Sequence, residues 1–237
     1  MEKGQKASFV IESDESLANA IRRSVNKIST LAIDSVEIHK NDSALYDEIL
    51  SHRLGLIPIR SNRKLDKLEK GAKPTSKNQL QITLKAKGPT TVYSKDLKGD
   101  IEVLYEDIPI VILDKDQELE LIAFANLGDG NSHAKFSPGL TYYRNVSEIK
   151  VKNSERAKEI LEKIGEKGNV KQGETIISNY DVDYIESLDD GEGVEVKPGK
   201  DIVFFIESWG QLTPKEIFQE ATKSLNKNLK DVLKAVK

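Results

Sequence analysis

Cysteine is absent from this chain of 237 residues, and histidine occurs only three times, as His39, His52 and His133. Without cysteine there can be no disulfide, no thiolate nucleophile, no cysteine-ligated zinc and no cysteine-held iron–sulfur cluster. Three separated histidines also argue against a histidine-built metal site. We therefore expect a protein that holds neither a metal nor a cofactor.

Long apolar runs are missing as well. No stretch approaches the roughly 20 apolar residues needed to span a bilayer, and residues 1–6 lack the apolar core of a signal peptide. Hydrophobic residues still make up 38% of the chain, which is enough to bury a core in one large domain or two small ones. These features predict a soluble, cytoplasmic protein with no membrane partner.

The chain also lacks an excess of positive charge. Its formal net charge is -3 and its isoelectric point is about 5.8. Lysine and arginine are mixed with aspartate and glutamate along the sequence, whereas a protein whose main task is to grip nucleic acid is usually basic. We therefore expect little or no direct contact with nucleic acid.

The sequence does contain both strand and helix patterns, which together predict an α+β fold. Alternating or continuous apolar residues predict strands, and apolar residues at intervals of three and four predict helices. The stretches 60–77 and 126–138 are polar or glycine-containing and are typical of loops. The predicted strands are 6–12, 31–39, 80–84, 108–113, 119–127, 175–187 and 201–208, and the predicted helices are 14–28, 44–54, 154–167 and 214–236.

Capping residues mark the start of the first two predicted helices. Asp14 can cap the first helix and Ser43 the second. The buried face of the second helix is expected to contain Leu45, Ile49 and Leu50. On the first helix, two arginines (Arg22 and Arg23) lie away from an apolar stripe that consists of Leu17, Ile21, Val25 and Ile28.

The C-terminal helix has the most complete set of local signals. Thr213 is the expected N-cap, Pro214 occupies the first helical position, and Glu216 completes a capping box. The helix would extend about 35 Å. Its apolar side must be buried either against its own chain or against a partner subunit, and the sequence leaves both possibilities open. The stripe consists of Phe218, Ala221, Leu225, Leu229, Val232 and Val236.

Three further patterns have the residue types of functional sites. Gly128-Asp129-Gly130 begins like a dinucleotide fingerprint, so a stand-alone nucleotide-binding protein is the alternative hypothesis. That fingerprint fails where His133 replaces its last glycine, and no convincing helix follows. His133 lacks the partner residues of a general base or a metal ligand. The acidic residues at 189, 190 and 192 lack the spacing of a calcium loop and predict a solvated turn.

Four segments carry a resemblance to a known family. They are LANAIRRSVNKISTLAIDSVEI (17–38), SHRLGLIPI (51–59), LGDGNSHAKFSPGLTYYR (127–144) and ESWGQLTPKEIFQEATKSLNKNL (207–229). In this order they resemble the D subunit of archaeal RNA polymerase and the third-largest subunit of the eukaryotic nuclear polymerases. The first and last segments are also similar to the amino-terminal domain of the bacterial α subunit. The resemblance covers essentially the whole chain.

The resemblance implies a discontinuous architecture. Residues 1–41 and 201–237 would together form a dimerisation domain, a sheet plus two amphipathic helices. Residues 42–200 would form an inserted, mainly β domain. Many archaeal D subunits carry an iron–sulfur subdomain within this insert. Since this chain has no cysteine, the corresponding region, at about 146–174, would be a reduced helical remnant without a cluster.

The resemblance also implies a non-catalytic role inside a nucleotidyltransferase complex, DNA-directed RNA polymerase. The largest subunits would hold the catalytic magnesium, and this chain would act as an assembly and scaffold subunit. It would pair with the small subunit L and dock the second-largest subunit and the small subunits N and P. The L interface would contain Leu17, Ile21, Val25, Ile28, Phe218, Ala221, Leu225, Leu229 and Val232, and the other docking residues would be Arg22, Arg23, His133, Lys135 and Phe136.

Overall fold

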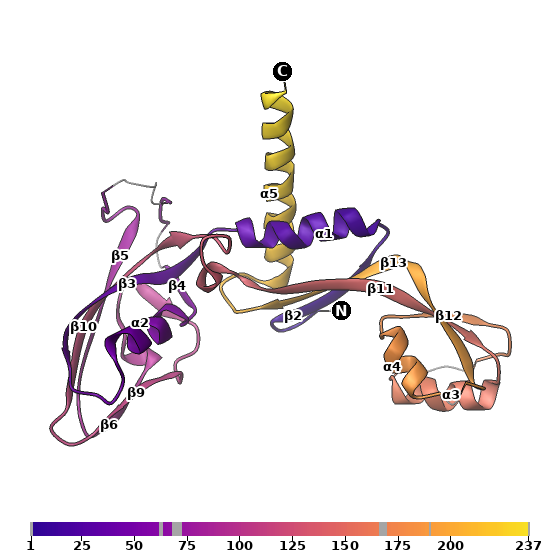
Figure 1. The fold of residues 1–237 in the computed structure, drawn as a ribbon, viewed down its shortest axis with the longest axis horizontal. Coiled ribbons are helices and arrows are strands. Elements are labelled where there is room, and N and C mark those ends of the chain that lie inside the picture. Colours follow the sequence, from indigo (N-terminus) through magenta and orange to yellow (C-terminus); the bar gives the residue numbers. More distant parts are fainter. Residues whose placement is uncertain (1, 62–63, 68–72, 166–169, 190, 237) are drawn as a thin grey trace. The chain divides into compact units, whose positions relative to one another are not determined.

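The chain folds into two compact units (Figure 1), seen in a computed structural model that describes residues 2–61, 64–67, 73–165, 170–189 and 191–236. The first unit combines Met1–Arg22 with Thr141–Ile206, and the second combines Arg23–Leu140 with Glu207–Lys237. Each unit therefore joins segments that lie far apart in the sequence. Helices accompany mostly antiparallel sheets, which confirms the predicted α+β class.

A five-stranded sheet forms the body of the first unit. Its strand order is β1-β2-β13-β11-β12, so an N-terminal strand lies beside a strand from near the C-terminal end. The first two residues of β11 and the last two of β13 belong to the second unit. The strands are β1 (Glu2–Lys3), β2 (Lys6–Ile11), β11 (Gly139–Val151), β12 (Thr175–Ser178) and β13 (Val194–Ser208).

One face of this sheet holds a row of stacked aromatic rings. The ring centroid of Phe204 lies 6.0 Å from that of Phe9 and 6.2 Å from that of Tyr143, and Phe204 is fully buried. Helix α1 (Glu15–Ser24) begins where the Asp14 carboxylate accepts a hydrogen bond from the N–H of Leu17 at 2.7 Å. This bond confirms the predicted cap. The predicted helix 14–28 continues only as a 3-10 turn, η1 (Val25–Lys27).

A second apolar cluster in this unit lies beside two short helices, α3 (Ser154–Lys163) and α4 (Val182–Ser187). The prediction of one strand over 175–187 was wrong beyond β12. Asp181 accepts a hydrogen bond from the N–H of Asp183 at 3.1 Å and thereby caps α4. Capping chemistry therefore overrides the strand propensity of this segment.

Helix α3 is shorter than the predicted 154–167. The side chain of Asn153 caps its start, and its last residue is Lys163. Gly165 then adopts a φ of 77°, in the left-handed region where glycine commonly follows a helix. Residues 166 and 167 of the prediction lie outside the described residues.

A four-stranded sheet in the order β3-β10-β5-β7 organises the second unit. Strand β10 pairs antiparallel with both β3 and β5, and its buried residues share a core with Leu80, Ile82 and Leu84 of β5. These three leucine and isoleucine residues alternate with exposed ones, as the sequence predicts. The strands are β3 (Thr30–Asn41), β5 (Gln79–Lys87), β7 (Lys98–Gly99) and β10 (Glu118–Gly128).

Smaller elements complete the second unit. Two pairs of short strands, β4 with β8 and β6 with β9, flank the same core. Leu65 is buried, so the predicted loop 60–77 is not wholly exposed in its described part. The elements are α2 (Asp47–Gly55), β4 (Ile59–Ser61), β6 (Thr90–Tyr93), η2 (Ser94–Asp96), β8 (Ile101–Val103), β9 (Pro109–Leu113), η3 (Ala134–Phe136) and α5 (Pro214–Ala235).

Helix α2 starts three residues later than predicted. Ser43 does not cap it, because the Ser43 hydroxyl donates to the Asn41 side chain at 2.6 Å and the N-cap position is occupied by Tyr46. Leu50 is buried as predicted, but Ile49 is exposed. The buried face of α2 instead consists of Leu50, Leu54 and Gly55.

Charged side chains form a ladder across three strands of the second unit. Glu118 on β10 accepts hydrogen bonds from Lys40 on β3, at 2.8 Å, and pairs with Lys87 on β5, at 3.1 Å. Lys85 and Glu120 form the next rung, 2.9 Å apart. The hydrogen bond from Lys40, followed by that from Lys87, lowers the pKa of Glu118 to about 2.

This pKa predicts a pH dependence. Because the folded pKa of Glu118 lies below its ordinary value of 4.5, the ladder stabilises the fold fully above about pH 4.5, and this contribution is lost as the pH falls towards 2. An NMR titration of the Glu118 carboxyl should have its midpoint near pH 2. Replacing Lys40 with alanine should raise that midpoint, whereas replacing the exposed turn residue Lys115 should not. An unchanged midpoint in the Lys40 variant would contradict the assigned cause.

The boundaries of the two compact units differ from those of the predicted domains. The predicted dimerisation domain (1–41 and 201–237) and insert (42–200) are defined by pairing with a partner, whereas the units are defined by packing within this chain. The domain assignment therefore stays a prediction.

Candidate partner-docking surfaces

The loop after β10 is built around Phe136. This ring is buried against Gly128, where an added Cβ atom would lie 2.6 Å from three ring carbons. The carbonyl of Phe136 accepts a hydrogen bond from the hydroxyl of Thr30, at the start of β3. Glycine at 128 is therefore required for close approach of the ring. Phe136, a predicted docking residue, lies inside the loop and anchors it.

Lys135, the next predicted docking residue, is held by an ion pair. Its ammonium lies 2.7 Å from the carboxylate of Asp34 and its side chain is only 13% exposed. Asn126 donates to the other carboxylate oxygen at 3.1 Å. Burial opposes ionisation of Asp34, but the hydrogen bonds from Lys135 and Asn126 outweigh it, so the pKa of Asp34 is lowered. The pair fixes the loop to β3.

His133 is the third predicted docking residue in this loop, and it is exposed. Its Nδ1 accepts a hydrogen bond from the backbone N–H of Lys135 at 3.1 Å. The neutral ring therefore carries its proton on Nε2, which leaves that atom as a donor. Such a donor can bond a carbonyl or carboxylate oxygen of a partner.

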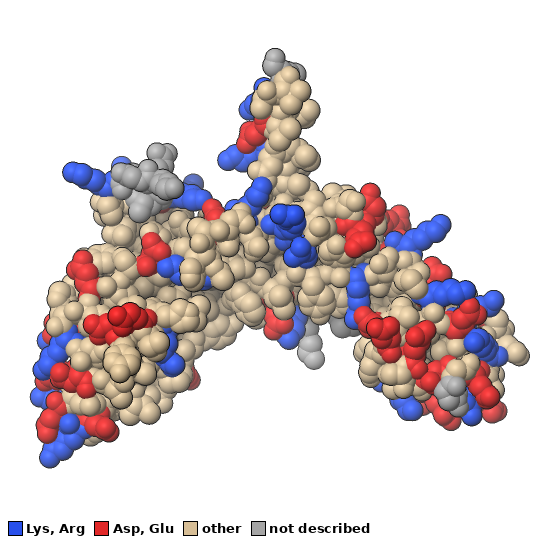
Figure 2. All heavy atoms as spheres, viewed as in Figure 1, with Lys and Arg blue, Asp and Glu red and all other residues tan. Residues whose placement is uncertain are grey.

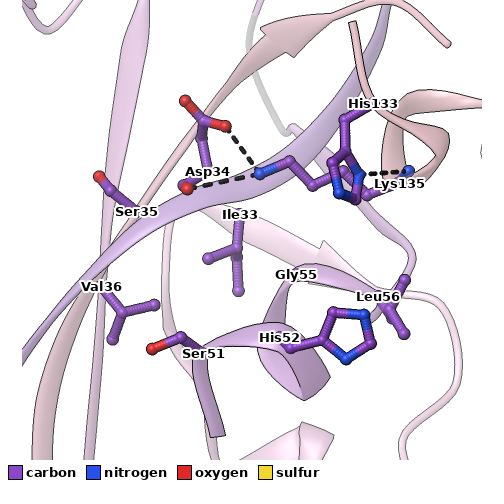
Figure 3. Close-up of a pocket in the computed structure, with 10 residues that line it drawn as sticks. All are labelled: Ile33, Asp34, Ser35, Val36, Ser51, His52, Gly55, Leu56, His133 and Lys135. Atoms are coloured by element: carbon purple, nitrogen blue, oxygen red, sulfur yellow. Dashed lines mark hydrogen bonds and ion pairs between the residues drawn. The ribbon is translucent and has the colours of Figure 1, made fainter. Parts of the chain in front are cut away.

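A pocket of about 200 Å³ opens beside the Lys135–Asp34 pair (Figure 3). Figure 3 shows Lys135 reaching along the pocket to Asp34, with the rings of His52 and His133 at the same end. The pocket thus offers two imidazoles beside apolar walls. Its lining residues are Ile33, Asp34, Ser35, Val36, Ser51, His52, Gly55, Leu56, His133 and Lys135.

A second hollow, of about 330 Å³, shares Leu56 and Lys135 with the first. Leu56, Tyr105 and Trp209 all line it and all remain exposed. Trp209 is held in place because its backbone N–H donates to the carbonyl of Pro138 at 3.0 Å. Exposed aromatic and aliphatic side chains around hollows mark protein interaction sites. We call the two hollows together the loop surface.

The C-terminal helix divides into a buried and an exposed half. Thr213 and Glu216 form the predicted capping box, and the predicted helix 214–236 is confirmed to within one residue. Ile217 and Ala221 are buried, and η1 packs against this half. Further along, Leu229, Val232 and Leu233 are 54%, 60% and 66% exposed. Among the described residues of its own unit, no other element lies beside these last turns (Figure 1).

The remaining predicted interface residues have mixed exposure. On the N-terminal stripe, Ile21, Val25 and Ile28 are buried within the chain, and only Leu17 is exposed. On α5, Phe218 and Leu225 are half-buried. The guanidinium of Arg22 donates to the side chain of Asn19 at 2.9 Å and 3.2 Å, while Arg23 is exposed.

Sequence reasoning missed several residues of the loop surface. Asp34 holds Lys135, yet it lies 101 positions away in the sequence. Asn126, on the strand that leads into the loop, donates to Asp34. Leu56, which lines both hollows, was also missed. Together with Tyr46 and Ile49, which lie outside the hollows, it forms an exposed apolar stripe along α2 and its two flanking positions. Their spacing of three and seven residues could have indicated this stripe, had the helix start been placed correctly.

The described residues also bear on a metal site, a membrane span and a nucleotide site. Among the described residues, no three His, Asp or Glu side chains converge in a way that could hold a metal ion. No helix within that part of the chain is long and apolar enough to cross a membrane.

After Gly128–Gly130 the chain forms a turn at Asp129–Ser132 and then the three-residue η3, not the α-helix that a dinucleotide site requires. The acidic turn is organised by Asp189, which accepts from the N–H groups of Gly193 and Val194.

Exposed apolar surfaces around a fixed loop and along a helix are typical of a protein that works as part of an assembly. Comparison with known proteins agrees. Residues 27–139 match the RNA polymerase Rpb3/RpoA insert domain. DNA-directed RNA polymerase subunit Rpo3 of Thermococcus kodakarensis is 37% identical over 228 residues, which cover 90% of this chain and 86% of that protein. The subunit Rpo3 of Pyrococcus horikoshii is 35% identical over 231 residues, which cover 92% of this chain and 88% of that protein.

A more distant relative, the subunit Rpo3 of Archaeoglobus fulgidus, is 28% identical and covers 99% of this chain. The chain belongs to the archaeal Rpo3 family of DNA-directed RNA polymerase subunits, whose process is transcription.

Proposed function

We propose that this chain is the assembly and scaffold component, the D subunit, of a cytoplasmic RNA polymerase. In this role it pairs with the small subunit L and docks the second-largest subunit and the small subunits N and P. It contributes no catalytic residue of its own and no cofactor. Without a cysteine in the sequence it cannot hold a cysteine-ligated iron–sulfur cluster.

The exposed half of α5 carries this proposal. An amphipathic helix is stable when its apolar side is buried, yet the side chains from Leu229 to Leu233 on this side remain open to solvent. A partner that lays an apolar helix along them would remove this surface from water. We assign this surface to subunit L, together with Leu17 on α1.

The loop surface supports the second part of the proposal. Its hollows accept apolar side chains beside Leu56 and Trp209, and His133 offers a hydrogen-bond donor. The Asp34–Lys135 pair and the buried Phe136 ring hold the loop in a fixed shape, which reduces the entropy lost on binding. We assign this surface, with Arg22 and Arg23, to the second-largest and small subunits.

Co-expression tests the proposal. The full chain should form a stable one-to-one complex with the L subunit of its own source, measured by size-exclusion chromatography with light scattering. The same chain expressed alone should self-associate or elute as a broad peak, because the α5 stripe is uncovered. A monodisperse monomer that ignores subunit L would refute the pairing.

A further inference from the structure

The first unit carries an aromatic strip on the sheet face opposite the Phe204 row. Side chains alternate along β11, so Tyr142 and Arg144 point away from Tyr143. Tyr142 stacks on Phe205 of β13, with ring centroids 4.7 Å apart and an interplanar angle of 11°. The guanidinium carbon of Arg144 lies 5.0 Å from the centroid of Phe205. Tyr142 keeps one side of this stack exposed to solvent.

Arg144 connects this stack to a second aromatic pair. One of its nitrogens pairs with the Asp181 carboxylate at 3.2 Å, and another donates to the carbonyl of Asn179 at 2.5 Å. Between those two residues stands Tyr180, whose ring lies 5.9 Å from that of Tyr184 on α4. Tyr180 and Tyr184 are 40% and 45% exposed. The aromatic strip thus comprises Tyr142, Phe205, Tyr180 and Tyr184, with Arg144 between the two pairs.

The segment that carries Tyr180 and Tyr184 is acidic, and Arg156 pairs with Glu192 at its far end, 3.8 Å apart. Residues 179–192 contain six acidic residues and neither lysine nor arginine. Arg144 is already paired with Asp181, whereas the exposed carboxylates of Asp183 and Glu186 have no ion-pair partner among the described residues. Figure 2 shows acidic side chains gathered over α4. A partner that covers this area must bring positive charge, and phosphate groups would be repelled.

Exposed tyrosines next to unpaired carboxylates suit one kind of ligand. Proline rings pack on aromatic faces, and an extended polyproline-type chain exposes carbonyls to which tyrosine hydroxyls can donate. Arginine or lysine in such a chain can pair with Asp183 and Glu186 and can lie over a tyrosine ring. We propose that the aromatic strip docks an extended, proline-containing and basic segment of a partner protein.

This docking surface is independent of the α5 stripe and of the loop surface, which are formed by the second unit. Its test uses the full chain and a fluorescein-labelled peptide of twelve residues in which proline alternates with arginine, with binding followed by fluorescence anisotropy. Replacing Tyr184 with serine should weaken binding about tenfold, the size expected when an aromatic contact and its cation–π partner are lost. The matched control is Tyr46→Ser, which removes another exposed tyrosine ring, on the second unit and away from the aromatic strip.

A second variant separates charge from packing. The double variant Asp183→Asn, Glu186→Gln preserves the size of both side chains and removes two negative charges. It should therefore lower the affinity for the arginine peptide and make the binding less dependent on salt. A peptide with glutamate in place of arginine should not bind. Equal binding by the wild-type chain and the Tyr184 variant, equal binding of the glutamate peptide, or no binding of the arginine peptide would each overturn the proposal. Displacement of the peptide by a twelve-nucleotide single-stranded DNA would also overturn it.

Discussion

Replacing Leu229 with aspartate is expected to abolish the one-to-one complex with the small partner subunit while leaving the isolated chain folded. The leucine is more than half exposed in the chain alone, so the substitution removes little packing there. In the proposed complex it would place an unpaired carboxylate in a desolvated seam, at a cost of about 3–5 kcal/mol. That cost lowers the affinity by a factor on the order of 10² to 10⁴. Co-expression followed by light scattering measures the loss.

The neighbouring residues provide the controls. Leu225→Asp should also prevent pairing, although Leu225 is half-buried and its replacement should destabilise the isolated chain as well. Lys227→Asp places the same carboxylate at an exposed position on the opposite side of the helix from Leu225 and Leu229, and it should leave the complex intact. A normal yield of complex from the Leu229 variant would mean that the exposed half of α5 does not form the interface.

Replacing Phe136 with alanine is expected to destabilise the second unit by about 3–5 kcal/mol. The ring is buried, it fills the space above Gly128, and its own carbonyl is tied to Thr30. Its loss leaves a cavity under the loop surface. Urea unfolding can be followed by the fluorescence of Trp209, the single tryptophan of the chain, which is bonded to Pro138 at the end of the same loop. Ile112→Ala is the control, because Ile112 is exposed on the same unit and should change stability by less than about 0.5 kcal/mol.

A double-mutant cycle tests the contact between the ring and the glycine. Gly128→Ala alone should cost about 1–3 kcal/mol, because the new methyl group would collide with the ring of Phe136. Phe136→Leu provides room for that methyl group. The two changes combined should therefore destabilise the unit by less than the sum of the separate effects, with a coupling above about 0.5 kcal/mol. Strict additivity would show that the two positions do not touch.

Local sequence signals predicted the elements that depend on local physics. The capping box at Thr213 and the cap at Asp14 were predicted from neighbouring residues, because each bond joins groups three positions apart. The strand alternation around Ile82 was likewise visible. The errors at α2 and α4 arose where a short polar side chain had more than one local partner. Ser43 bonds Asn41 instead of capping a helix, and Asp181 caps a helix inside the segment predicted as a strand.

The candidate surfaces were predictable only in part. The α5 stripe follows from helical spacing. Spacing does not show, however, which part of the stripe is buried against the chain itself and which part is exposed. Structure was needed to show that burial stops between Ala221 and Leu229. The ion pair between Asp34 and Lys135 joins residues 101 positions apart, so no local pattern indicates it. The aromatic strip similarly depends on strands β11 and β13 lying side by side.

The pairing of β2 with β13 also constrains how the chain folds as it leaves the ribosome. Strand β2 is made early, but its neighbour β13 follows about 180 residues later. At typical synthesis rates this is a delay on the order of 10 to 40 s. During this delay Phe9 has no Phe204 to stack on, while β3, β5 and β10 of the second unit are all complete before β13 begins. The second sheet can therefore form first, and the N-terminal strand must be kept from pairing wrongly until synthesis is nearly finished.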